Sequence, residues 1–178
     1  RLKPGMKKAT MNTMKRLAVL MLALASTACI TNRDMRQWLV WEKNLQVTEV
    51  RRSQQCAAAD GTTHIYLLPT LADVRSWESG RGIDLSGGPG AALNPEVPYA
   101  LIDLGQRSSA GYALAVSRMA GRRKQVLTLK ATFIEPKPDS MQAQVITSPC
   151  VLVSLPPQAW VEVEVIDQAS ELRASSRH

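Results

Sequence analysis

The sequence predicts a mainly β protein, an antiparallel β sandwich or barrel with one short helix, and an α+β arrangement is the alternative. Three observations favour this class. Apolar side chains alternate along several short segments, as they do in half-buried strands. Ten glycines and ten prolines divide the sequence with turns. Clear helical periodicity occurs in one short segment. Closely spaced short strands with frequent turns are typical of sandwiches and barrels.

The predicted strands carry either β-branched and aromatic residues or strict apolar–polar alternation. Residues 63–68 (THIYLL) are of the first kind, and residues 160–166 (WVEVEVI) are of the second. Residues 112–118 and 126–133 are predicted to pair as a hairpin across a turn at 120–124. The full set of predicted strands is 44–51, 63–68, 99–104, 112–118, 126–133, 142–148, 150–155 and 160–166.

The predicted helix begins after Thr70 and ends at Gly80, a residue type that commonly stops helices. Thr70 and Asp73 have the spacing of a capping box, in which each side chain accepts a hydrogen bond from the backbone N–H of the other. Apolar residues at helical spacing give the segment one apolar stripe. The stripe consists of Leu71, Val74 and Trp77.

Residues 1–28 are expected to be a signal peptide with an upstream extension. Lys15 and Arg16 form its positive head, and residues 17–25 form an unbroken apolar run. Small residues then lead to Cys29, which completes the pattern of a secretion signal. The apolar run is far shorter than the roughly 20 residues that span a bilayer as a helix. The pattern therefore predicts export rather than a membrane span.

Cys29 is the expected lipid-attachment residue. The chain has three cysteines, an odd number that is unusual in an exported protein, and acylation of Cys29 leaves one even pair. Ser26 stands where lipoprotein signals usually carry Leu, so a plain secreted protein with Cys29 as a free thiol is the alternative. Residues 29–37 are the expected lipid-anchored tether. Ile30, in place of a retaining Asp, favours the outer membrane of the cell envelope, facing the periplasm.

The mature chain is expected to hold one β-rich domain, residues 38–168, followed by a disordered polar tail, residues 169–178. Export is compatible with a disulfide between Cys56 and Cys150. Such a bond closes a loop of roughly 95 residues, and the chain-entropy relation gives it about 4 to 5 kcal/mol. Two buried, unpaired thiols are the alternative.

The basic charge of the sequence lies mostly in the leader. Six of the 22 Lys and Arg and none of the 15 acidic residues precede Cys29, which leaves 16 basic and 15 acidic residues in the mature chain. Strongly basic composition is typical of nucleic-acid-binding domains, and the mature chain lacks it. We therefore expect no nucleic-acid partner.

The residues that could carry chemistry predict no enzyme, no metal and no cofactor. The sequence has two histidines, His64 within a predicted strand and His178 at the last position. Two distant cysteines and one internal histidine do not have the spacing of a zinc site. The Gly-x-Ser-x-Gly motif of a hydrolase nucleophile is absent from the sequence. Glu162 and Glu164 share one face of a strand, which offers no burial to a paired-carboxylate site.

Two motifs flank the predicted hairpin. Residues 105–112 read Gly-Gln-Arg-Ser-Ser-Ala-Gly-Tyr, and residues 142–150 read Gln-Ala-Gln-Val-Ile-Thr-Ser-Pro-Cys after a proline-rich connection. With the strand that precedes them, these motifs make the stretch from about Tyr99 to Pro156 resemble the C-terminal domain of the PrcB protease-complex subunit family. Ser108, Ser109 and Ala110 stand where the family pattern has Pro, Thr and Gly, and Cys150 stands where it has an aromatic residue.

The resemblance implies a non-catalytic lipoprotein that binds or stabilises an exported protease complex. We expect loops 105–111 and 134–141 to lie at one end of the sandwich, because rigid scaffolds carry their binding loops in this way. The candidate binding loop contains Gly105, Ser108, Ser109, Gly111 and Tyr112. Two other functions stay open. One is a chagasin-like protease inhibitor, whose Asn-Pro-Thr-Thr-Gly-Tyr loop is distantly similar, and the other is an envelope lipoprotein that binds a small ligand.

Overall fold

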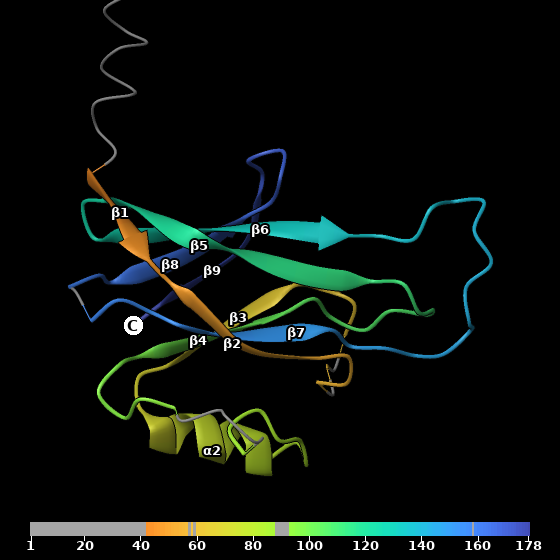
Figure 1. Ribbon diagram of the computed structural model, residues 1–178, viewed down its shortest axis with the longest axis horizontal. Coiled ribbons are helices and arrows are strands. Elements are labelled where there is room, and N and C mark those ends of the chain that lie inside the picture. The colour runs from red at the N-terminus through yellow and green to blue at the C-terminus, as the bar shows by residue number, and fades with distance from the viewer. Residues whose placement is uncertain (1–41, 57, 59, 88–92, 158) are drawn as a thin grey trace, which may run out of the picture. The chain divides into compact units, whose positions relative to one another are not determined.

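The computed structural model describes residues 42–178 except 57, 59, 88–92 and 158 (Figure 1). The predicted signal peptide, Cys29 and the tether lie outside the described residues. No helix in the described part is long and apolar enough to cross a membrane. The elements are β1 (Glu42–Gln46), β2 (Thr48–Ser53), β3 (His64–Leu68), α2 (Leu71–Ser79), β4 (Tyr99–Asp103), β5 (Ala113–Arg123), β6 (Val126–Ile134), β7 (Cys150–Ser154), β8 (Glu162–Ile166) and β9 (Leu172–Arg177).

The strands form two separate sheets, which confirms the predicted β class and the sandwich rather than the barrel. One sheet has the order β1-β5-β6-β8-β9, and the other has the order β2-β7-β4-β3. Neighbouring strands are antiparallel, with the exception of β6 and β8. Parallel neighbours need a long crossover, and here the chain passes through β7 in the opposite sheet before it returns as β8.

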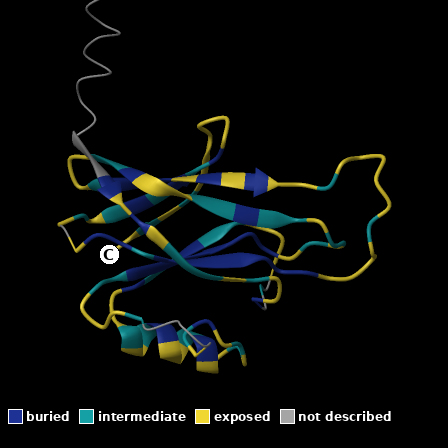
Figure 2. Cartoon of the chain, in the orientation of Figure 1, coloured by how far each residue is buried: buried dark blue, intermediate teal, exposed yellow. Residues whose placement is uncertain are grey.

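Apolar side chains from both sheets meet between them and form the main core. β6 contributes Leu127 and Leu129, and β7 contributes Val151 and Val153, all four nearly or fully buried. Burial of a side chain of this size stabilises a fold by about 1.5 to 3 kcal/mol. Figure 2 shows buried residues along β7, alternating buried and exposed residues on β6, and exposed residues along most of the connections.

The helix α2 covers the outer face of the four-stranded sheet and creates a second, smaller core. Val74 of α2 packs there with Leu101 of β4 and Leu152 of β7. All five residues of β4 are therefore buried, which explains its continuous apolar sequence. The predicted capping box is present: the Asp73 N–H donates to Thr70 Oγ1 at 3.2 Å, and the Thr70 N–H donates to Asp73 Oδ2 at 2.9 Å.

The predicted edge strand 44–51 is two strands in the structure. The chain leaves the five-stranded sheet after β1 and enters the four-stranded sheet as β2. Val47 lies at the crossing point, where it is 2 % exposed and donates its N–H to the Arg118 carbonyl at 3.0 Å. The alternation of Leu45 and Val47 indicated burial correctly, but it could not show that the two residues flank a change of sheet.

The predicted turn at 120–124 is wrong, because β5 continues to Arg123. A bulge between Val116 and Ala120 shifts the register and brings Ala120 into the core at 1 % exposure. The hairpin therefore reverses at Lys124 and Gln125, and Lys124 has a positive φ of 55°. A bulge inserts extra residues that strict alternation does not anticipate.

The predicted disorder of residues 169–178 is also wrong, since β9 pairs with β8 along its length. The Asp167 carboxylate accepts the backbone N–H groups of Ala169 and Glu171 at 2.8 and 2.9 Å and so forms the turn between the two strands. Arg177 and Glu162 then form an ion pair at 3.0 Å across them. The polar composition of this segment reflects an edge strand with one face in solvent.

Candidate functional site

The two predicted binding loops lie at the same end of the sandwich. Ala113 at the start of β5 pairs with Ile134 at the end of β6, so the connections that precede β5 and follow β6 leave the hairpin together. Both connections extend beyond the strands on the side opposite the two-residue turn (Figure 1). The loop pair, residues 104–112 with residues 135–149, is therefore one structural unit.

Backbone hydrogen bonds join the two loops into a short irregular ribbon. Arg107 and Thr147 exchange two bonds, of 2.8 and 2.9 Å, and Ala110 donates its N–H to the Ala143 carbonyl at 2.9 Å. The Thr147 hydroxyl donates to the Ser109 carbonyl at 3.1 Å. Residues 142–148 were predicted as an extended strand, but they form isolated bridges instead of a regular ladder.

Two glycines of the candidate loop occupy backbone conformations that disfavour other residues. Gly105 has a φ of +86°, and a Cβ there would collide with the backbone of Gly61 and Thr62. Gly111 has a φ of +95°, and a Cβ there would lie 2.7 Å from a side-chain oxygen of Gln142. Both positions combine left-handed geometry with a close neighbour, so both depend on glycine.

The remaining candidate residues divide into an exposed and a packed group. Ser108 is exposed, and Ser109 is half-buried beneath Thr147. Tyr112 packs against the main core, and the Arg107 guanidinium lies 5.6 Å from the centre of its ring. Tyr112 is half-buried and therefore holds the loop to the sandwich.

Arg107 clamps the loop to the body of the domain. Its guanidinium donates to the Gly61 carbonyl at 2.9 Å and to the Leu104 carbonyl at 2.6 Å. These bonds satisfy backbone acceptors of two separate connections with one planar side chain, as a guanidinium does well. The sequence offered no sign of this role, because the carbonyl of Gly61 that Arg107 binds lies 46 residues away along the chain.

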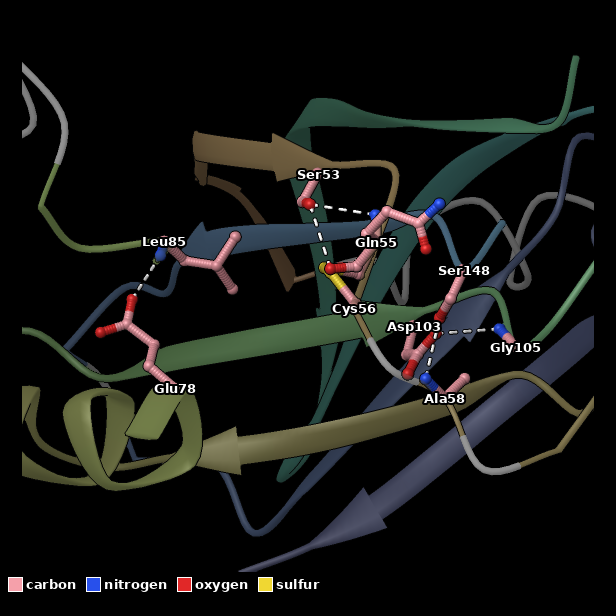
Figure 3. The surroundings of a disulfide bond; sticks show 10 residues. Ser53, Gln55, Cys56, Ala58, Glu78, Leu85, Asp103, Gly105 and Ser148 are labelled. Atoms are coloured by element: carbon pink, nitrogen blue, oxygen red, sulfur yellow. Dashed lines mark hydrogen bonds between the residues drawn. A yellow bond between two sulfur atoms is a disulfide. The ribbon is translucent and has the colours of Figure 1, made fainter. Parts of the chain in front are cut away.

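A buried carboxylate lies directly beneath the loop. Asp103 is fully buried, and its Oδ1 accepts the Gly105 N–H at 2.9 Å and the Ser148 hydroxyl at 3.5 Å (Figure 3). Its Oδ2 has no hydrogen-bond partner among the described residues. Burial raises the pKa of Asp103, against the opposing effect of the Gly105 hydrogen bond and of the charges on His64 and Arg81. The last residue of β4 thus fixes the start of the loop.

The Cys56–Cys150 disulfide is present and lies beside Asp103, so its prediction is confirmed. The two Cα atoms are 6.0 Å apart, and Cys150 is the cross-strand partner of Asp103. Ser148 completes the junction, because its hydroxyl also accepts the Ala58 N–H at 3.0 Å (Figure 3). A covalent bond and a buried polar group therefore anchor the root of both loops.

The outer part of the second loop carries exposed apolar side chains. Met141 is fully exposed, Ile146 is 64 % exposed and Val145 is 48 % exposed. Figure 2 shows exposed residues along most of this connection. Met141 lies in the loop 134–141 that was expected to bind a partner, whereas Val145 and Ile146 were predicted to lie in the strand 142–148 and were not candidate site residues.

The polar groups elsewhere show no comparable assembly in the described part of the chain. Within that part, no three His, Cys, Asp or Glu side chains are grouped in a way that could hold a metal ion. His64 bonds through Nε2 to Thr62 Oγ1 at 2.7 Å and to Asp60 Oδ1 at 3.1 Å. Hydrogen bonds from the Thr62 hydroxyl and backbone N–H, with His64, lower the pKa of Asp60 to about 2.

An open pocket lies beside β5 and β6, with a volume of about 360 Å³. Lys130 and Asp167 line it together with small side chains such as Ala115 and Ser117. Asp167 already bonds to the turn before β9, as described above. The pocket is separate from the loop pair. It is open to solvent and its lining is both polar and apolar, whereas small-ligand sites are usually deep and mostly apolar.

Comparison with known proteins agrees with the resemblance inferred from the sequence. A family model described as PrcB C-terminal matches residues 99–156. The matched stretch, about a third of the chain, runs from β4 to just beyond β7 and includes both loops, Asp103 and Cys150. Neither the curated proteins nor the solved structures gave a match.

Proposed function

We propose that this protein, in which residues 99–156 match the PrcB C-terminal family, is a non-catalytic interaction subunit of the cell envelope. Lipid on Cys29 would hold it at the outer membrane, facing the periplasm, and its partner would be an exported protein such as a protease. One observation carries the proposal: an irregular loop with exposed apolar side chains is fixed to a rigid scaffold by a disulfide and a buried carboxylate.

The exposed side chains favour a binding role because they give the isolated domain no stability. Apolar surface contributes to free energy only when it leaves water, at about 25 cal/mol per Å². Met141, Val145 and Ile146 lie within six residues of one another and remain in solvent. A partner that covered them would gain the free energy that the fold itself does not use. Methionine is also enriched at protein interfaces.

The geometry beneath the loops supports a structural role for the polar groups. Asp103 and Ser148 are both buried, at 0 and 4 % exposure, so neither reaches a bound substrate. Asp103 bonds to the backbone of Gly105, and Ser148 bonds to the backbone of Ala58. These contacts position chain segments, which supports a non-catalytic function.

Site-specific photocrosslinking tests the interaction. The photoreactive residue benzoylphenylalanine replaces Met141 in one variant and Met119 in the control, since Met119 is also an exposed apolar residue (45 %) but lies on β5. Irradiation of whole cells should give a discrete crosslinked envelope protein from position 141 and none from position 119. Identical products at both positions, or none at either, would refute a loop-directed interaction.

Palmitate labelling tests the anchor. Wild-type protein should incorporate labelled palmitate and partition with the outer membrane, whereas Cys29→Ser should remain an unlabelled precursor. Cys56→Ser provides the control, because that cysteine is disulfide-bonded in the folded domain and should not affect labelling. Labelling that persists in Cys29→Ser would show that another residue carries the lipid, or that lipidation does not depend on this signal.

A further inference from the structure

The backbone of the exposed loop has a free edge. On its inner side, the stretch 142–147 is bonded to the first loop through the Ala143 carbonyl and both polar groups of Thr147. On its outer side, the N–H groups of Gln144 and Ile146 have no hydrogen-bond partner among the described residues. Both residues are exposed. The same stretch therefore combines unpaired backbone donors with the apolar side chains described above.

The outer side of this stretch is already used for strand pairing at its base. Ser148 donates its N–H to the Gln54 carbonyl and accepts the Cys56 N–H at its own carbonyl, both at 2.9 Å. Gln55 and Ser148 thus form a parallel bridge, and the Gln55 side chain donates to the Ile146 carbonyl at 3.1 Å. The Gln55 side chain therefore lies against Ile146, whereas no hydrogen bond from the described residues reaches the N–H groups of Gln144 and Ile146.

We propose that an extended segment of the partner protein lies beside this stretch and pairs with the backbone at Gln144 and Ile146. This inference rests on the proposed interaction function and specifies how the partner binds. In this mode of binding, called strand addition, an extended peptide pairs with an exposed strand edge. Backbone hydrogen bonds provide the affinity, and contacts with alternate side chains of the peptide provide the specificity. The segment should therefore carry apolar residues at alternate positions, which contact Met141, Val145 and Ile146.

Charge and length define the partner further. The exposed part of the loop carries Glu135, Lys137 and Asp139, so it has no strong excess of either sign. Strong attraction to an anionic membrane surface would need a basic cluster, which this loop lacks. The bond from the Val145 N–H to the Ala143 carbonyl bends the chain at Gln144, so the free edge is short. A short, uncharged, extended peptide segment fits these features better than a lipid surface.

Comparing Gln144→Pro with Gln144→Ala distinguishes the contribution of the backbone N–H to binding from the contribution of the side chain. Proline removes the N–H of Gln144, and it suits this position because the backbone φ there is not positive. Alanine keeps the N–H and removes the same side chain, including its bond to the Gln142 carbonyl. The assay measures binding of each purified variant to the protein identified by crosslinking at Met141. Thermal unfolding of each variant first confirms that the fold is intact.

Strand addition predicts that Gln144→Pro weakens binding at least tenfold and that Gln144→Ala stays within about threefold of wild type. The Ile146 amide should also exchange with deuterium at least tenfold more slowly in the complex. Equal binding by both variants, with slow exchange absent, would overturn strand addition and leave the interaction function intact. Equal weakening of both variants would show that the Gln144 side chain is recognised, which also overturns it.

Other occupants give distinct results. If crosslinking at Met141 joins two copies of this chain, or if the Cys29→Ser chain binds vesicles of envelope lipids through this loop, the partner assigned here is wrong. If Met141 crosslinks to nothing, the proposed function itself fails. The failure of the binding mode and the failure of the function are therefore distinguishable.

Discussion

The β5–β6 hairpin ends in two very different ways. At one end the chain reverses within two residues, Lys124 and Gln125, between strands that are paired up to Arg123 and Val126. At the other end the strands separate into two loops, and the second loop needs the fifteen residues 135–149 to reach β7. Both ends belong to the same pair of strands, so the difference is not dictated by the sheet.

The short end shows that two residues are enough to close this hairpin. The connections at the long end are longer than the geometry of the strands requires. Most hairpin loops have two to five residues, and much longer irregular connections are usually functional. The short end is charged and exposes no large apolar side chain. The long end exposes several, although a disulfide and a buried carboxylate hold its root. A loop that is fixed at its root and exposes an apolar tip to water supports the proposed role in binding a partner.

The largest effect is expected from the disulfide at the root of the long end. Cys56→Ala with Cys150→Ala should lower the free energy of unfolding by about 4 kcal/mol, because the bond closes a loop of 94 residues. Urea denaturation of the mature domain measures the loss, and a dithiol reductant should produce a similar change in the wild type. A loss below about 1 kcal/mol would mean that the root is held by other contacts.

The glycines of the loops give a graded series. Gly105→Ala should cost about 2 to 4 kcal/mol, because its Cβ meets rigid backbone and its φ is positive. Gly111→Ala should cost less, about 1 to 2 kcal/mol, because the flexible Gln142 side chain can move aside. Gly82→Ala serves as control, since its φ is +66° and its Cβ would meet nothing within 4 Å. Equal losses at all three positions would contradict the clamped loop.

The buried carboxylate should make the long end sensitive to pH. Burial raises the pKa of Asp103, so the folded chain retains a proton that the unfolded chain releases above its ordinary pKa of 3.8. The contribution of Asp103 to stability therefore falls as the pH rises from 3.8 through the raised pKa. Asp103→Asn does not titrate, so its stability relative to wild type should rise as the pH increases from 4 to 8, as urea denaturation at each pH would show.

Asp167 provides a control of opposite sign. Hydrogen bonds from the Glu171 and Ala169 backbone and from Arg173 lower the pKa of Asp167, against the effect of desolvation. Its stabilisation is present above the ordinary pKa of 3.8 and is lost as the pH falls through the lowered pKa. Asp167→Asn should therefore be destabilised at pH 7 and approach wild type in acid. Parallel pH profiles for wild type and Asp103→Asn would show that the Asp103 carboxyl is solvated in solution.

The sequence predicted the elements whose signals are local. The Thr70–Asp73 spacing identified the start of α2, and the alternation in residues 126–133 identified the buried face of β6. The sequence could not predict β9, because its polar residues become a strand only through pairing with β8 and through the turn at Asp167. The prediction succeeded for α2 and β6, whose signals come from neighbouring residues in the sequence. It failed for β9, whose structure depends on contacts with another strand.

The same distinction applies to the candidate site. The motif at 105–112 and its resemblance to the PrcB family pointed to one end of the sandwich, where the structure brings the two predicted loops together, and cysteine parity pointed to the disulfide. Nothing local marked Asp103 as buried, since its burial comes from β3, β7 and the Ser148 segment. Val145 and Ile146 were predicted to lie in the strand 142–148, because sequence alone does not show whether an apolar side chain is buried or exposed.

The smallest effect on stability is expected at the tip of the long loop, and this result decides the comparison. Met141→Ser and Ile146→Ser should change the free energy of unfolding by no more than about 0.5 kcal/mol, as Arg123→Ser should at the charged end of the hairpin. The side chains at 141 and 146 are exposed in the free domain, so their removal costs the fold little. Urea denaturation of the three variants measures the change. If Met141→Ser or Ile146→Ser instead lost more than 1 kcal/mol, these side chains would be packed within the domain, and the loop would have no apolar surface left to offer a partner.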